Sequence, residues 1–295
     1  MDLGDWEKAG RIASEALNHG KSLIKEGALL RDVCDEIEGK IIDLGGDIAF
    51  PAQISLNETA AHYCPDIDDE TVFKDQIVCL DVGAHVNGAI GDNALTVDLS
   101  GKYTDLVKAS LDALNSAIKV LRPGITLGEI GKTIQEAIES YGYNPVRNLS
   151  GHGLGPYQIH TPPTIPNFDT KDNTELIEGQ TIAIEPFATN GDGFIHEKGV
   201  ATVFSMTGRK PVRSNMVRQV YAVVERFDEL PFTSRWLKQE FSQGQVNFAL
   251  KQFEQLEIMK KYPPLVEKTG GLVSQAEHSL IVRDKPVILT KKGDE

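Results

Sequence analysis

The first 145 residues alternate between two kinds of hydrophobic pattern. Apolar side chains recur every three or four positions in four segments, which predicts amphipathic helices at 6–25, 29–44, 104–121 and 126–142. Between the second and third of these segments, β-branched and apolar runs predict strands at 48–56 and 77–98, and Pro51 confines part of the first to a sheet edge or a bend. The order helix, helix, strands, helix, helix, strand predicts an α+β domain whose helices cover one face of a largely antiparallel sheet.

The stretch 77–98 predicts a β-hairpin with one acid in each strand. Asn87-Gly88 is a strong signal for a hairpin turn. Asp81 and Asp92 interrupt the apolar runs on either side, and buried acids cost free energy unless something compensates their charges, which also repel each other. A bound cation would remove both costs. Taken alone, the motif fits equally well with one Asp that caps a turn and another that is half exposed.

Further ligand-type residues follow along the chain. His152 lies in a predicted glycine-rich turn, Glu185 interrupts the apolar strand 181–187, and Glu277 precedes another apolar run. These strands contain no matching Lys or Arg, so an ion explains four acids in strand contexts better than coincidence does. Carboxylate oxygen with imidazole nitrogen suits Mn, Fe, Co or Zn. For the lone His62, in a predicted loop or strand end, a structural role is the ordinary interpretation.

Composition narrows the class of protein. Hydrophobic residues make up 40% and charged residues 25% of 295 positions, which is typical of a globular chain. No apolar run is long enough to span a bilayer and the first residues do not resemble a secretory signal, so we expect a cytoplasmic protein without membrane contact. The three cysteines include no C-x-x-C pair, which speaks against a thiolate zinc site and a disulfide framework. A net charge of −13 disfavours stable nucleic-acid binding.

Taken in order, these residues resemble the pattern of the type 2 methionine aminopeptidases, members of the M24 metallopeptidases with the pita-bread fold. Five motifs match the metal-ligand positions of that family: LDVGAH with Asp81, GDNALTVD with Asp92, SGHG with His152, IEPF with Glu185 and QAEHS with Glu277. Four more match its substrate-pocket and catalytic segments: AFP with Phe50, AAHYCP with His62, IH with Ile159 and His160, and YPP with Tyr262. Asn93, Ala276 and Ser279 depart from the residues expected beside these motifs.

The resemblance implies antiparallel sheets with pseudo-twofold symmetry, two divalent metal ions per chain (Co, Mn, Fe or Zn) and removal of N-terminal methionine from nascent polypeptides when the second residue is small. Independently of the resemblance, we expect a monomer, although no sequence feature fixes the oligomeric state. In the family's scheme Asp81 would bind one ion, His152 the other, and Asp92 and Glu277 both. Glu185 would bind the second ion and act as general base. The remaining positions imply stabilisation of the tetrahedral intermediate and substrate binding by His62 and His160, and a methionine pocket lined by Phe50, Ile159 and Tyr262.

The long interval between Glu185 and Glu277 predicts an inserted module. Apolar spacing in 190–260 predicts two or three short amphipathic helices, which resemble the type 2 insertion, so we expect 1–295 to be one catalytic domain carrying it. The insertion has 10 Lys and Arg against 8 Asp and Glu, which allows a transient ribosome contact as a hypothesis. Two alternatives are an Xaa-Pro aminopeptidase or prolidase on the same fold, and a non-catalytic ribosome- or RNA-binding homologue, although such homologues lose metal ligands.

Overall fold

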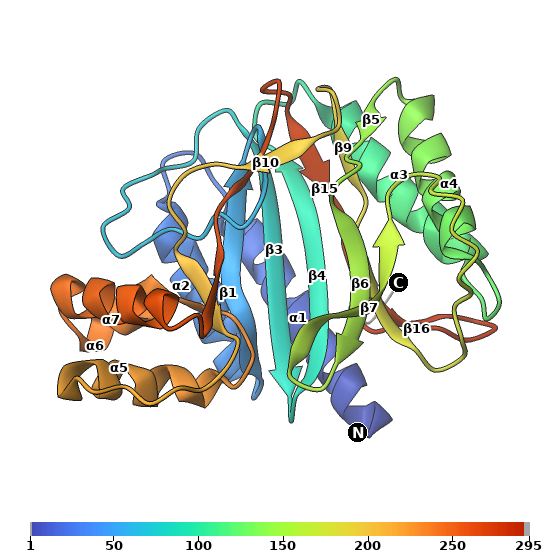
Figure 1. Ribbon diagram of the computed structural model, residues 1–295. Coiled ribbons are helices and arrows are strands. Elements are labelled where there is room, and N and C mark those ends of the chain that lie inside the picture. The colour runs from blue at the N-terminus through green and yellow to red at the C-terminus, as the bar shows by residue number, and fades with distance from the viewer. Residues whose placement is uncertain (1, 292–295) are drawn as a thin grey trace.

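The computed structural model describes residues 2–291. Figure 1 shows a central sheet with helices behind it and a separate group of helices at one side. The helices are α1 (Leu3–Leu23), α2 (Leu30–Asp43), α3 (Thr104–Val120), α4 (Leu127–Ser140), α5 (Asn215–Val224), α6 (Ser234–Glu240), α7 (Gln243–Gln255) and the 3-10 helix η1 (Glu225–Phe227). No helix within residues 2–291 is long and apolar enough to cross a membrane.

The strands are short outside the central sheet. They are β1 (Asp47–Leu56), β2 (Thr59–Ala61), β3 (Ile77–Val86), β4 (Ala89–Asp98), β5 (Asn144–Pro145), β6 (Ser150–Gly155), β7 (Gln158–Pro166), β8 (Thr181–Ile184), β9 (Phe187–Thr189), β10 (Ile195–Glu197), β11 (Val203–Met206), β12 (Phe232–Thr233), β13 (Met259–Tyr262), β14 (Leu265–Glu267), β15 (Val273–Gln275), β16 (Glu277–Ile281) and β17 (Val287–Ile288).

The central sheet has eight antiparallel strands, in the order β1-β3-β4-β16-β8-β6-β7, with β17 paired to β16. The predicted hairpin of β3 and β4 is confirmed: Val86 pairs with Ala89, and the two loop residues between them, Asn87 and Gly88, both have positive φ, as a type I′ turn requires. The expectation for Pro51 is also confirmed, because β1 is an edge strand whose register shifts on both sides of Phe50.

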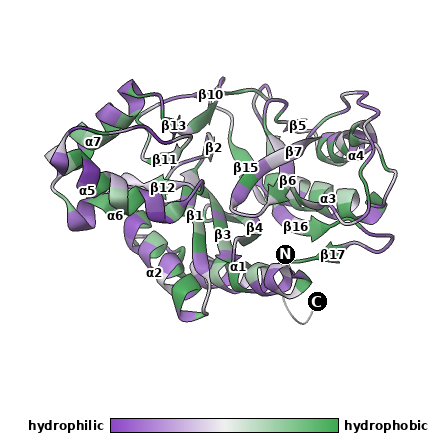
Figure 2. Ribbon diagram, turned by 60° about the horizontal axis from the view of Figure 1, so that its bottom comes forward, coloured by the Kyte–Doolittle hydropathy of each residue, from purple (hydrophilic) through white to green (hydrophobic). Residues whose placement is uncertain are grey.

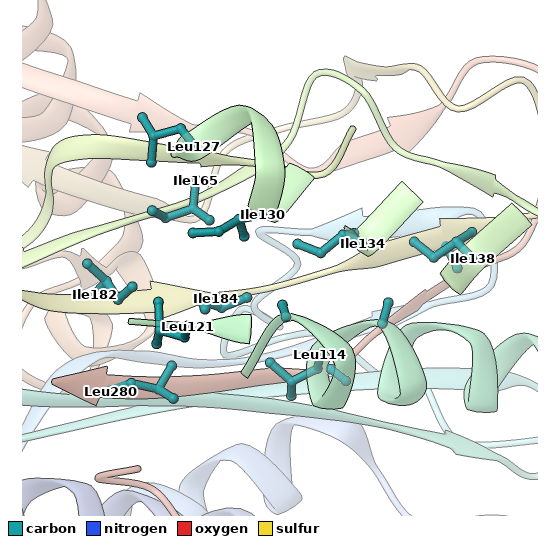
Figure 3. Close-up of a cluster of buried hydrophobic side chains, with 14 of the residues drawn as sticks. Leu114, Leu121, Leu127, Ile130, Ile134, Ile138, Ile165, Ile182, Ile184 and Leu280 are labelled. Carbon is teal, nitrogen blue, oxygen red and sulfur yellow. The ribbon is translucent and has the colours of Figure 1, made fainter. Parts of the chain in front are cut away.

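Helices α1 to α4 pack on one face of this sheet, as the hydrophobic pattern predicts. Successive strand residues point to opposite faces, so alternate positions of β3 enter the core with α1 and α2. Figure 3 shows the equivalent packing at the other end, where residues of α3 and α4 meet the strands. The capping box is present at the start of α4: the Thr126 hydroxyl accepts from the Glu129 amide, and the Glu129 carboxylate accepts from the Thr126 amide.

The segment 201–259 forms an apolar cluster separate from the helix-covered face of the sheet. Three helices lie in it, in agreement with the predicted two or three, and α5, α6 and α7 gather at one end of the molecule in Figure 2. The sequence pattern missed that β11 lies between β12 and β13 in a small sheet, which brings β13 and Tyr262 back towards the centre of the protein.

A buried ionic cluster fastens α6 to α2 and β1. Arg235 is 1% exposed and pairs with Asp35 and with Glu38, whose Oε1 lies 2.7 Å from Arg235 Nη2. Glu38 also accepts from Trp236 Nε1 at 2.8 Å and from the Ala52 amide at 3.1 Å. Because the partners of this α2 carboxylate come from both α6 and β1, it ties the insertion to the strand that carries Phe50.

Two local predictions were wrong. His152 lies within β6 and not in a turn. Glycine is needed on both sides of it because a Cβ at Gly151 or Gly153 would come within 2.3 Å of a carbonyl oxygen on a neighbouring strand. Glu185 does not lie inside a strand: β8 ends at Ile184 because Pro186 has no amide hydrogen to continue the ladder.

Candidate metal centre

Strand register places the hairpin acids on the sheet face opposite α1 to α4. Asp81 of β3 pairs with Ala94 of β4. Gly83, two positions after Asp81 in β3, pairs with Asp92 of β4, so the two aspartates are diagonal neighbours on one face. Ala94 also pairs with Glu277 on its other side. The antiparallel register therefore turns three acids from β3, β4 and β16 towards the same space.

The other two ligand-type residues reach this face from β6 and from the position directly after β8. His152 pairs with Ala183, and Glu185 follows Ala183 by two positions, so both side chains point to the side of the acids. His152 Nε2 lies 3.6 Å from Glu185 Oε1 and 3.8 Å from Asp92 Oδ2. Ligand atoms of Asp92, His152 and Glu277 all lie within 4.8 Å of one another. The fold thus brings together residues spread from position 81 to position 277.

Burial gives these groups unusual proton affinities. Loss of water raises the pKa of Asp81 to about 7, and raises the pKa of Asp92, Glu185 and Glu277 well above the ordinary range, with repulsion among the carboxylates adding to each of these last three shifts. Burial lowers the pKa of His152 to about 3, so this imidazole is neutral at pH 7. A neutral imidazole beside carboxylates is the form that coordinates a metal.

The cluster meets the requirements of a divalent cation. Four carboxylates crowd together without a Lys or Arg ion pair among the described residues, and Asp81 Oδ1 is a buried acceptor with no hydrogen-bond partner in the same part of the chain. A cation there would offset the repulsion and satisfy this oxygen. The oxygen and nitrogen donors suit borderline divalent metals. The residues present therefore fit a metal centre.

Residues that the sequence patterns did not single out hold the ligands in place. Gln275 is buried and donates from Nε2 to Glu185 Oε2 at 3.4 Å, while Thr96 holds the Gln275 backbone. The Ser279 hydroxyl accepts from the Asp92 amide and donates to the Asp92 carbonyl, both at 2.7 Å. The departure at position 279 therefore still supports a ligand strand. Gln275 could have been noticed from its position two residues before Glu277.

A cavity of about 490 Å³ opens onto the acids and contains all five predicted pocket residues in its lining. They are Phe50, His62, Ile159, His160 and Tyr262. The ring of Phe50 occupies space that a side chain at position 83 would take, because a Cβ on Gly83 would lie 2.1 Å from Phe50 Cε1. This glycine is therefore required for the ring to lie beside the metal ligands.

Of the two pocket histidines, His160 lies beside the ligand-type residue His152, and His62 lies beside Tyr262. The ring centroids of His160 and His152 are 4.5 Å apart, and those of His62 and Tyr262 are 5.5 Å apart. Burial lowers the pKa of His62 and of His160 to about 4, so both are neutral near pH 7. His62 has a left-handed φ of +66°, and its amide donates to Gln53 Oε1 at 2.7 Å.

Comparison with known proteins gives the family. The model of metallopeptidase family M24 matches residues 5–218. The chain belongs to this family. As an M24 metallopeptidase it is 44% identical to a methionine aminopeptidase from Archaeoglobus fulgidus over 287 residues, which cover 97% of each protein. It is 42% identical to a methionine aminopeptidase from Methanocaldococcus jannaschii, over 99% of this chain and 100% of the relative.

The M24 fold is also found in solved structures. The crystal structure of methionine aminopeptidase from Thermotoga maritima superposes with a TM-score of 0.72 at 25% identity, over 99% of this chain and 98% of that one. The predicted α+β pita-bread fold is thus confirmed for this M24 chain, and the resemblance inferred from its motifs agrees with relatives of matching length. Membership of a metallopeptidase family also supports the use of divalent metal.

Proposed function

We propose that this M24 protein removes the N-terminal methionine from polypeptides whose second residue is small. One observation carries the proposal: five ligand-type side chains face one pocket in a chain that matches methionine aminopeptidases along nearly its whole length. Xaa-Pro aminopeptidase or prolidase activity is not favoured, because these full-length relatives are methionine aminopeptidases. A non-catalytic role is disfavoured because no ligand-type position is lost.

We infer that two divalent ions are held by Asp81, Asp92, His152, Glu185 and Glu277. Mn, Fe, Co and Zn all suit this set of donors. When bound, such ions would supply Lewis acidity to the scissile carbonyl and lower the pKa of water towards neutrality. The protein contributes to metal binding by fixing the donor atoms on a sheet. It also keeps lysine and arginine side chains away from the ligand cluster.

Glu185 is the residue that we propose as general base. Its position after the end of β8 leaves it outside the strand ladder, while Gln275 holds one carboxylate oxygen and the other lies near His152. In this scheme Glu185 takes the proton of the attacking water and passes it to the leaving amine.

His62 and His160 would hydrogen-bond the scissile amide. Both rings line the cavity and both are neutral at pH 7, so each can donate one N–H without bringing a charge into the pocket. His62 Nδ1 is buried and has no hydrogen-bond partner among the described residues. Donors aimed at the developing oxyanion stabilise the transition state more than the ground state.

The apolar residues in the cavity lining account for a preference for methionine as the first residue of the substrate. Phe50, Ile159 and Tyr262 line the same cavity as the ligands, and an unbranched thioether fills an irregular apolar space well. The side chain of the second substrate residue would lie against the part of the cavity lining that contains His62. The left-handed backbone of His62 is held by Gln53, so this wall cannot easily retreat, and a large second side chain would clash.

The remaining inferences concern the setting of the reaction. We infer that the enzyme works as a monomer in the cytoplasm on nascent chains, as one catalytic domain carrying the insertion at 190–260. The small positive excess of that insertion, against −13 for the whole chain, is compatible with a transient ribosome contact. Stable nucleic-acid binding is not expected for so acidic a protein.

Kinetics on Met-X-Ser peptides test the proposal. We expect kcat/KM for X = Ala to exceed that for X = Leu or Asp by about 10- to 10²-fold, because overfilling a packed site costs about 1–3 kcal/mol. Acetylation of the amino terminus should abolish cleavage. Comparable values for X = Ala and X = Leu would contradict the specificity, and cleavage of Ala-Pro peptides in preference to Met-Ala-Ser would favour the prolidase alternative.

A further inference from the structure

One lysine lies at the wall of the cavity, beside the groups that would hold the scissile bond. Lys260 belongs to β13 and lines the same cavity as His62 and His160. Its ammonium nitrogen lies 4.7 Å from the centroid of the Tyr262 ring, a cation–π contact. The Tyr262 ring is in turn 5.5 Å from the His62 ring. The ammonium group therefore lies within about 10 Å of the His62 imidazole, the distance spanned by about three extended residues.

No acid in the described part of the chain neutralises the charge of Lys260. It makes no ion pair among residues 2–291, whereas its neighbour Lys261 pairs with Glu254 of α7. Lys261 also lines the cavity, but alternation along β13 sends its side chain to the side opposite Lys260 and Tyr262, where Glu254 holds its ammonium group. The Tyr262 hydroxyl lies 3.1 Å from Ser205 Oγ, so the ring that carries the ammonium group is itself anchored.

Lys260 shares the cavity lining with two other charged side chains outside the metal-ligand cluster, Lys261 and Glu197. The ammonium of Lys260 contributes to lowering the pKa of both His62 and His160, after the larger effect of burial. A substrate that extends away from the scissile bond would pass the Lys260 ammonium group, which lies on the Tyr262 ring beside His62.

We propose that Lys260 is a specificity-determining residue that selects polypeptides with an acidic side chain at the third position. The inference rests on the proposed aminopeptidase function. The second residue must be small to pass His62, so the third is the first side chain that can carry a charge. At about 3.3 Å per extended residue, it comes within reach of the Lys260 ammonium. Aspartate or glutamate there would be attracted, and lysine or arginine would be repelled.

The test compares Met-Ala-Asp, Met-Ala-Asn and Met-Ala-Lys peptides with identical amidated tails, at low salt and at 0.5 M salt. For the unmodified enzyme we expect kcat/KM to fall by about three- to tenfold at each step from Asp to Asn to Lys, the size of a partly screened charge pair. The preference should shrink at high salt. Lys260→Met should remove it, Lys260→Glu should reverse it, and Lys260→Arg should retain it. Lys261→Met is the matched control and should keep the unmodified preference.

The outcomes separate this inference from the proposed function. If Met-Ala-Asn is cleaved but the three peptides react alike, or if Lys260→Met keeps the full preference, the role of Lys260 is wrong while the function stands. If loss of the preference follows Lys261→Met equally, the field is diffuse and Lys260 is not its source. If metal-loaded, unmodified enzyme cleaves none of the three peptides, the proposed function itself fails.

Discussion

The buried pair of Arg235 and Glu38 predicts a large and pH-dependent cost for Arg235→Met. Arg235 is 1% and Glu38 6% exposed, so the substitution leaves a carboxylate buried without its cation. Breaking such a pair costs about 3–5 kcal/mol of unfolding free energy. The hydrogen bonds from Trp236 and the Ala52 amide remain and place the expected value at the lower end, about 3 kcal/mol.

Urea unfolding of matched variants measures this cost. Lys132→Met is the control, since Lys132 and Glu136 form an exposed pair 3.7 Å apart with side chains 58% and 67% exposed, which is worth about 0–1 kcal/mol. Adding Glu38→Gln to Arg235→Met should recover part of the loss, because no buried charge is then left unpaired. Equal costs for Arg235→Met and Lys132→Met, or a double variant that loses the sum of both single losses, would refute the reasoning.

The pH dependence has a definite sign. Burial raises the pKa of Glu38 even with Arg235 present, and loss of Arg235 raises it further. An acid whose folded pKa lies above its unfolded value stabilises the fold below the unfolded pKa and loses that contribution as pH rises through the folded pKa. The cost of Arg235→Met should therefore be smaller at pH 5 than at pH 8, when unfolding is measured at both.

Three further predictions concern the metal centre. Glu277→Gln should lower the metal content measured by elemental analysis and abolish turnover with the fold intact, since an amide cannot neutralise a cation; two tightly held ions with normal turnover would contradict the assignment. His160→Ala should keep its metal yet lose about 10²–10³-fold in kcat, the usual effect of removing one oxyanion donor; a change in KM alone would make it a binding residue. The metal-free protein should lose thermal stability as pH rises from about 4 to about 7, through the raised pKa of Asp81, and added metal should restore more of it at pH 7 than at pH 5; a melting temperature independent of pH would contradict this.

The hairpin was predictable because its signals are local. Asn87-Gly88 specifies the turn, and the two-residue loop then fixes which residues of β3 and β4 face each other. The proximity of His152 and Glu185 was implied only by resemblance to a family, since no local pattern brings these positions together. Their meeting depends on β8 pairing between β6 and β16, a contact between distant segments.

The misses have physical causes. The glycines around His152 predicted a turn because glycine has more conformational freedom than other residues. In the structure they instead allow neighbouring strands to approach closely. The strands of the insertion are two to four residues long and pair with segments far along the chain, so neither length nor periodicity could identify them. The role of Lys260 was invisible for the same reason, because it depends on which side of β13 faces the cavity.

Register links the stability of the sheet to its chemistry. Along β3, Leu80 and Val82 enter the helix-covered core while Asp81 faces the cavity, and a slip of one residue would exchange them. Such a slip would bury a charge among leucines and expose the core, so the hydrophobic effect that holds α1 and α2 on one face also aims the acids at the other. The repulsion among the acids is then a local cost that the apolar core offsets. This explains how a cluster that disfavours folding without metal can be held in one geometry before any metal binds.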